Sequence, residues 1–298
     1  MTRTHANLLL FLAAFFWGAG NVAQKLVLDD IGPLLACGLR SAIGCVVIAP
    51  LLLRESSASR VPLRSEGRAI FAVSALFALA LGLQQVAYGG TSVTNASFLV
   101  NCTVVLTPPL AWLLCRDRPG LVVWPAMAAA SMGAFMLAGT WTGLRWGDAL
   151  CLASALVYSV WIILLGDLVK RLDRPLLVAG AQFTLCAVVF TPLGLLIEAP
   201  TLHGLANALP HLAILGIFST GAAFGLQALA QRHAPPSDAA IIMSGESVFG
   251  AAAGAAVLDE RLDSGGVFGA VLILAAIVAV QLPLGQGKPV ESAGPART

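Results

Sequence analysis

One acidic residue lies deep inside an apolar stretch of the chain. Glu246 is flanked by small and aliphatic residues, and a charged group at the middle of a bilayer is unfavourable by at least about 2.5–3.5 kcal/mol. Burial disfavours the charged form of a carboxyl group, so such a residue can bind and release a proton. Glu246 is therefore a candidate for coupling to protons or for holding a substrate amine. The alternative is a carboxylic acid that only hydrogen-bonds a neighbouring helix.

Two glycines follow Glu246 at helical spacing. Gly250 and Gly254 come four and eight residues later, so all three residues share one helix face. A face of small residues at GxxxG spacing lets another helix approach closely. We expect this face to pack against protein rather than lipid.

The second charged residue well inside a span is Arg40. Its guanidinium group can pair with a substrate carboxylate or with Glu246. It can equally extend along its apolar stem toward the outer interface.

Further polar and aromatic residues recur within apolar stretches. Trp17, Asn21 and Gln24 have the spacing of one helix stripe, and their two amides offer neutral hydrogen bonds to an amino acid backbone. Packing between helices is the alternative role for this stripe and for the remaining candidates. These remaining candidates for substrate binding are Gln84, Asn101, Tyr158, Trp161 and Gln227.

The composition indicates where these residues must lie. Of the 298 residues 58% are apolar and 11% are charged, whereas soluble proteins have about 45–50% and about 25%. Ten apolar stretches are long enough to cross a bilayer, which takes about 20 residues. The sequence therefore predicts an all-α polytopic membrane protein with ten transmembrane helices. The expected spans are residues 6–28, 33–54, 67–88, 94–115, 121–140, 147–168, 175–198, 209–232, 238–258 and 265–284.

Several function classes find no support in the sequence. The net charge of +2 offers no basic surface for nucleic acid, and no Walker phosphate-binding motif is present. The four histidines are scattered, and the six cysteines lie in apolar stretches without CxxC spacing, so we expect no metal and no cofactor. An integral membrane enzyme acting on lipid phosphates would need clustered acids and histidines, so this alternative is remote.

The basic residues predict the orientation. With a cytoplasmic N-terminus, thirteen of the 17 basic residues lie in cytoplasmic segments, and Lys25, Arg145 and Arg261 lie outside. The positive-inside rule then favours two cytoplasmic termini. Arg3 and His5 ahead of Leu8–Trp17 also fit a secretory signal peptide, although no sharp small-residue cleavage site follows.

The chain partly matches itself after a shift of 143 residues. Eight identities occur in 39 ungapped positions, and Gly82-Leu83-Gln84 falls on Gly225-Leu226-Gln227. The same shift aligns Thr103 with Glu246. The repeat holds five spans, and an odd number requires that the two copies insert in opposite orientations, as in many secondary transporters. We expect a first repeat at 1–145, a second repeat at 146–286 and a disordered cytoplasmic tail at 287–298.

Motifs in both halves resemble the EamA family of the drug/metabolite transporter superfamily. They are Phe16-Trp17-Gly18, the stretch 99–108, the stretch 246–252 and Asp259-Glu260-Arg261-Leu262. Ser247 departs from the family, which often has Pro there, and Asp117 stands where Glu is commoner. The resemblance implies ten spans in two inverted EamA repeats. It also implies an inner-membrane transporter. Most members of the family are exporters of amino acids, related metabolites or toxic compounds.

The leading hypothesis is a secondary active transporter in a bacterial inner membrane, not an enzyme. It would export amino acids or related small metabolites by alternating access, with proton coupling at Glu246. The alternative is a permease for uptake or facilitated exchange. The expected partners are a small-molecule substrate and the lipid bilayer, with the chain as a monomer or homodimer and no nucleic acid.

Overall fold

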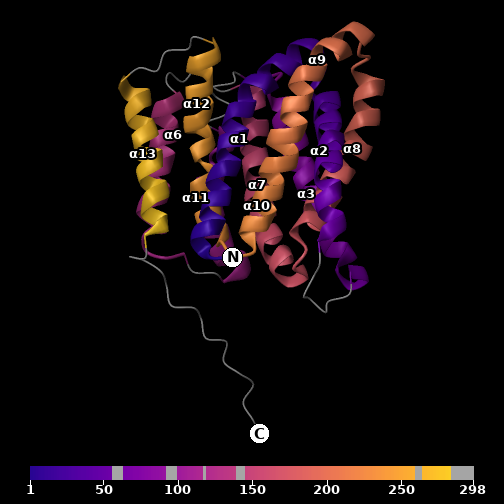
Figure 1. Cartoon of the computed structure of the whole chain (residues 1–298). Coiled ribbons are helices and arrows are strands. Elements are labelled where there is room, and N and C mark those ends of the chain that lie inside the picture. The colour runs from indigo at the N-terminus through magenta and orange to yellow at the C-terminus, as the bar shows by residue number, and fades with distance from the viewer. Residues whose placement is uncertain (56–62, 92–98, 117–118, 139–144, 259–263, 283–298) are drawn as a thin grey trace.

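The computed structural model describes residues 1–55, 63–91, 99–116, 119–138, 145–258 and 264–282. Every regular element in these ranges is a helix, and the helices form one upright bundle (Figure 1). In chain order they are α1 (Arg3–Asp30), α2 (Pro33–Arg54), α3 (Leu63–Ala87), α5 (Thr103–Cys115), α6 (Val123–Ala138), α7 (Trp146–Leu172), α8 (Pro175–Ile197), α9 (Leu202–Ile214), the π-helix η1 (Leu215–Ala222), α10 (Ala223–Gln231), α11 (Pro236–Met243), α12 (Gly245–Leu258) and α13 (Ser264–Gln281).

The ten predicted spans are confirmed in the described part of the chain. Eight helical segments are long and apolar enough to cross a membrane, and α5 and α6 are the two shorter apolar helices. The segments α9, η1 and α10 together make one span, and α11 and α12 make another. The ten spans form two five-helix repeats in inverted orientation. The expected tail at 287–298 lies outside the described residues.

Two expected spans differ from the structure. The span expected at 209–232 begins at Leu202, because Thr201 caps this helix and the polar residues of its first turns had hidden its start. The span expected at 94–115 is described only from residue 99, and a turn at Asn101 and Cys102 interrupts it before α5. Pro108 and Pro109 lie inside α5.

Helices α2 and α8 cap each other. The carboxylate of Glu198, which follows α8, accepts hydrogen bonds from Leu34 N (2.7 Å) and Leu35 N (2.9 Å) at the start of α2. The carboxylate of Glu55, which follows α2, accepts hydrogen bonds from the first amides of α8, Leu176 N (2.8 Å) and Leu177 N (3.0 Å).

These caps follow from the repeat. Glu55 and Glu198 are 143 residues apart, which is the repeat distance, so they are equivalent residues at opposite ends of an antiparallel helix pair. Each cap satisfies amide groups that a helix start leaves unpaired, and each opposes the positive end of a helix dipole with a negative charge. The pair α2 and α8 is therefore locked at both ends by the same interaction.

Helix α1 packs lengthwise against helices of the second repeat, among them α12, α10 and α9 (Figure 1). A side chain added at Gly18 would lie 2.5 Å from the carbonyl oxygen of Glu246 and 2.6 Å from the amide nitrogen of Gly250. The small face predicted on the ninth span therefore packs against protein at Gly250. This close approach holds the start of α12 against the middle of α1.

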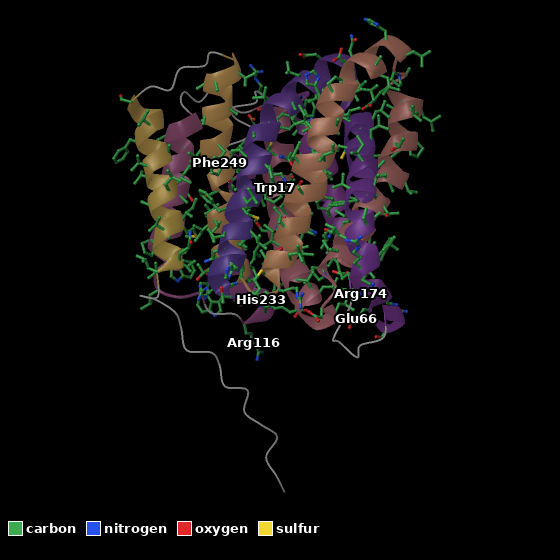
Figure 2. The ribbon with its side chains drawn as sticks, in the orientation of Figure 1. Trp17, Glu66, Arg116, Arg174, His233 and Phe249 are labelled. Carbon is green, nitrogen blue, oxygen red and sulfur yellow. The ribbon has the colours of Figure 1, made fainter. Side chains whose placement is uncertain are left out.

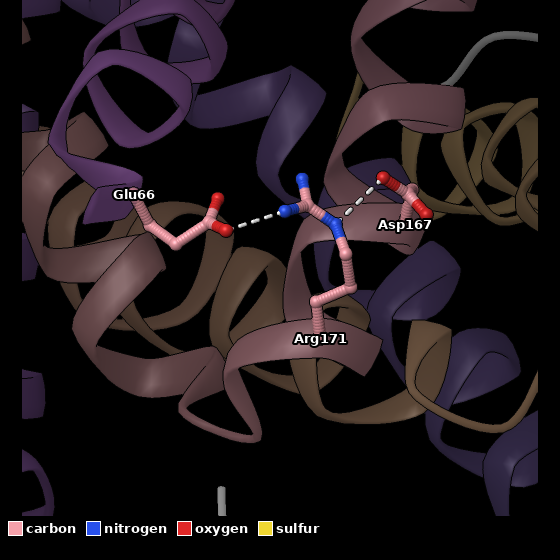
Figure 3. A network of polar contacts seen from close by, with 3 residues as sticks. All are labelled: Glu66, Asp167 and Arg171. Atoms are coloured by element: carbon pink, nitrogen blue, oxygen red, sulfur yellow. Dashed lines mark hydrogen bonds and ion pairs between the residues drawn. The ribbon is translucent and has the colours of Figure 1, made fainter. Parts of the chain in front are cut away.

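The N-terminal end of the bundle carries charged groups that link neighbouring spans. Figure 2 places Glu66, Arg116, Arg174 and His233 at this end. Figure 3 shows Arg171 between Glu66 (2.7 Å) and Asp167 (3.0 Å). The other ion pairs here are Arg3–Asp238, Arg174–Glu55 and Arg232–Asp173.

The close approach at Gly18 gives a stability prediction. Replacing Gly18 with Ala forces the α1 and α12 backbones apart, because the added carbon would meet backbone atoms rather than a flexible side-chain end. Overpacking of this kind typically destabilises by about 1–3 kcal/mol. Thermal unfolding of the purified protein in detergent measures the effect. The control is Gly67→Ala, where nothing in the described part of the chain lies within 4 Å of the added carbon; equal melting temperatures for the two variants would contradict the contact.

The reciprocal caps give a second prediction. Glu55→Ala and Glu198→Ala should each lower stability by about 0.5–2 kcal/mol, the usual loss for a helix cap. Because the caps lie at opposite ends of α2, the two losses should add in the double variant. Thermal unfolding again measures this, with Asp29→Ala at an exposed position as the control. A double variant no less stable than either single variant would show that the caps are not independent locks.

Candidate functional site

A cavity lies inside the bundle, between helices of both repeats. Its volume is about 100 Å³, whereas one water molecule needs about 10–15 Å³ of such space. The cavity therefore has room for a small metabolite. Figure 2 shows Trp17, one of its wall residues, about halfway along the bundle.

All ten residues singled out in the sequence line this one cavity. They are Trp17, Asn21, Gln24, Arg40, Gln84, Asn101, Tyr158, Trp161, Gln227 and Glu246. They come from six helices and from the turn at Asn101, which lie far apart in the sequence. Their roles in substrate binding remain predictions, but their convergence on one space is a fact of the fold.

Arg40 does not extend toward the interface. Its side chain is buried, with 6% of the residue exposed, and its three hydrogen-bond acceptors are all neutral. Nη1 donates to Gln24 Oε1 (2.7 Å), Nη2 to Ser219 Oγ (2.8 Å) and Nε to Thr220 Oγ1 (2.8 Å). Among the described residues no ion pair joins Arg40 to Glu246, although both line the cavity. The positive charge of Arg40 is therefore held in position without being neutralised.

The π-helical segment η1 supplies two of these acceptors. A π-helix is wider than an α-helix and is frequent at functional sites. Ser219 also accepts a hydrogen bond at its backbone oxygen from Trp17 Nε1 (2.9 Å). The widened turn thus contacts both α1 and α2 at the level of the cavity.

Glu246 lies in the first turn of α12, directly after the interruption at Ser244. It is half-buried, and its Oε1 accepts a hydrogen bond from Asn21 Nδ2 (3.4 Å). The carboxyl group therefore faces the cavity and α1. On α1 it meets the stripe of Trp17, Asn21 and Gln24 that the spacing predicted.

The two helix interruptions are equivalent in the two repeats. The turn at Asn101 in the fourth span and the turn at Ser244 in the ninth span are 143 residues apart. Asn101 Nδ2 donates a hydrogen bond to Ser247 Oγ, which links the two spans near their interruptions. Discontinuous helices of this kind commonly border the binding site of secondary transporters.

Aromatic residues form another wall of the cavity. The ring centroids of Trp17 and Phe224 are 4.7 Å apart, and those of Tyr158 and Trp161 are 5.8 Å apart. Tyr158 OH donates to Gln84 Oε1 (3.0 Å). This wall offers an apolar surface next to the polar groups of Arg40 and Glu246.

Sequence reasoning missed several lining residues. Gln85, Tyr88, Ser219, Phe224 and Ser244 also line the cavity. Thr220 was missed as well, although it holds Arg40. The available signals were the adjacent pairs Gln84-Gln85 and Ser219-Thr220, each polar within an apolar span. The π-helix that turns Ser219 and Thr220 toward Arg40 has no comparable signature.

Comparisons with known proteins agree with this architecture. The EamA-like transporter family matches the chain twice, over residues 4–139 and 145–282. An uncharacterized transporter of Archaeoglobus fulgidus is 30% identical over 94% of this chain and 87% of its own length. The uncharacterized transporter YwfM of Bacillus subtilis is 22% identical over 96% of this chain and 97% of its own length.

A solved structure has the same fold. One crystal structure superposes with a TM-score of 0.77 and covers 94% of this chain and 97% of its own, at 18% sequence identity. Since the family matches both halves and nearly the whole length, this chain belongs to the EamA-like transporter family and is a multi-pass membrane transporter.

Proposed function

We propose that the protein is a secondary active exporter of amino acids or closely related small metabolites, coupled to protons through Glu246. The observation that carries the proposal is the pairing of charges in one cavity. Among the described lining residues Arg40 is the only basic one and Glu246 the only acidic one. A zwitterion presents one carboxylate and one ammonium group, which complement these two residues.

Proton coupling follows from competition at Glu246. The carboxyl group can hold a proton or the ammonium group of a substrate, but not both at once. A proton that enters from outside would therefore displace the substrate and travel inward as the substrate leaves. Alternating access between two inverted repeats supplies the movement that exposes the cavity to each side in turn.

The direction of transport is the more specific part of this proposal. One fold can run either way according to the gradients, and uptake or facilitated exchange is the alternative. An inward proton gradient drives export only if proton binding and substrate binding exclude each other, so the coupling test also tests the direction.

Substitution of Glu246 tests the coupling. In liposomes, labelled amino acids from a panel should be transported faster when an imposed pH gradient drives protons in the opposite direction than when there is no gradient. Glu246→Gln should abolish this difference. Exchange of substrate without a gradient should survive in this variant, because the amide still fills the site. The matched control is Asp29→Asn, an exposed acid outside the cavity. Transport that is equal with and without the gradient in the unmodified protein would rule out proton coupling.

The proposed location is a bacterial inner membrane with both termini in the cytoplasm. Thiol labelling with an impermeant reagent tests the orientation in a variant that lacks the six native cysteines. Arg145→Cys should react in intact cells, and Arg116→Cys should react only after the cells are permeabilised. The reverse pattern would contradict the orientation that the basic residues predict.

A further inference from the structure

We propose that Arg40 and the amide of Gln24 form a subsite for a single carboxylate, beside which the amide oxygen of Gln85 accepts from an ammonium group, so that this transporter selects substrates by their free carboxylate group. This inference rests on the proposed function and makes its substrate class more specific. It depends on which N–H groups of Arg40 bind the protein and which remain available to a ligand in the cavity.

The guanidinium group of Arg40 is only partly used by the protein. Its five N–H groups are fixed donors, and three of them bind Gln24, Ser219 and Thr220. One bond uses Nε, one uses Nη1 and one uses Nη2, which leaves one N–H on each terminal nitrogen. Two such groups match the two oxygens of a carboxylate, which arginine commonly binds in bidentate fashion.

The orientations of the two neighbouring amides are fixed by Arg40. Because arginine can only donate, the atom of Gln24 at 2.7 Å from Nη1 must be its oxygen. That oxygen also accepts from Gln85 Nε2 (3.0 Å), which fixes the amide of Gln85 in turn. The chain of bonds therefore determines which atoms remain available.

Two atoms of this cluster are buried and have no hydrogen-bond partner in the described part of the chain. They are Gln24 Nε2, a donor, and Gln85 Oε1, an acceptor. The residues themselves are 6% and 1% exposed, and both line the cavity. A buried polar group without a hydrogen bond is unfavourable, and such groups are rare in native proteins. A ligand with a carboxylate beside an ammonium group would satisfy both, since the carboxylate accepts from Gln24 and the ammonium donates to Gln85.

The charge of the cavity favours a carboxylate over a phosphate. A phosphate group carries about −1.5 to −2 charges near neutral pH, whereas Arg40 is the only basic residue among the described lining residues. Glu246 in the same cavity would repel the excess negative charge. A carboxylate, with one negative charge, is matched by one guanidinium.

The rival explanation is structural. Arg40 joins α2 to α1 and to η1, and a buried arginine could serve only to hold these helices together. In that case the cluster would affect folding but would not distinguish between ligands. Ligand discrimination, rather than stability or transport rate, is therefore the measurement that separates the two explanations.

The experiment compares binding of matched ligands to the purified full chain in nanodiscs, by titration calorimetry. The first set is phenylalanine, phenylalaninamide, hydrocinnamate and phenyl phosphate, and the second is alanine, alaninamide and propanoate. Each amide lacks the carboxylate, and each simple acid lacks the amine. We expect the amino acids to bind at least about tenfold more tightly than their amides, and phenyl phosphate to bind more weakly than hydrocinnamate.

Two variants test the role of the cluster. Arg40→Gln should reduce the ratio of acid to amide affinity to about one. Gln24→Glu should do the same while preserving the fold, because its carboxylate keeps the bonds from Arg40 and Gln85 but neutralises the guanidinium and removes the free donor. The control is Arg68→Gln, an exposed arginine, which should leave the ratio unchanged.

The outcomes separate this inference from the proposed function. Binding of hydrocinnamate or propanoate that depends on Arg40, without transport of any amino acid, would keep the carboxylate subsite and overturn the amino acid exporter. Amides that bind as tightly as acids, an acid preference that persists in Gln24→Glu, tighter binding of phenyl phosphate, or no binding of any ligand would overturn the subsite.

Discussion

The structure depends on the burial of a single guanidinium group within a membrane-spanning bundle. A charge there is unfavourable unless polar groups surround it, and two helical segments, α1 and η1, supply those groups to Arg40. The acceptors from η1 require a π-helical turn, and the acceptor from α1 requires a glutamine at one position of the stripe that also presents Trp17 and Asn21. The cavity is the space that this arrangement leaves beside the charge.

The inverted repeat explains how the rest of the bundle supports that space. Equivalent glutamates cap α2 and α8 at opposite ends, so the helix that carries Arg40 is fixed to its counterpart. Equivalent interruptions in the fourth and ninth spans border the cavity. The chemistry is nonetheless asymmetric, because Thr103 in the first repeat corresponds to Glu246 in the second. Among the described residues, this pseudo-symmetric scaffold therefore brings one carboxyl group to the lining of the cavity.

Most of the fold was predictable, because hydropathy and an odd-numbered repeat each depend on many residues. The cavity was predictable in part, since a polar residue inside a membrane helix has to face protein or water, and Gln84, Gln227 and Glu246 all line the cavity. The acceptors of Arg40 were not predictable, because no sequence pattern marks the π-helix at Leu215–Ala222. The reciprocal caps were also missed, since Glu55 and Glu198 look like ordinary loop acids until the helices are paired.

The central claim is that one carboxyl group, Glu246, exchanges a proton for the amine of a substrate held at Arg40. Proton release on binding tests this directly, with a pH indicator in lightly buffered solution near neutral pH and no membrane gradient. We expect that a bound amino acid releases a proton from the unmodified protein and none from Glu246→Gln, while an acid that lacks the amine releases none from either. Amino acid binding without proton release from the unmodified protein would contradict it.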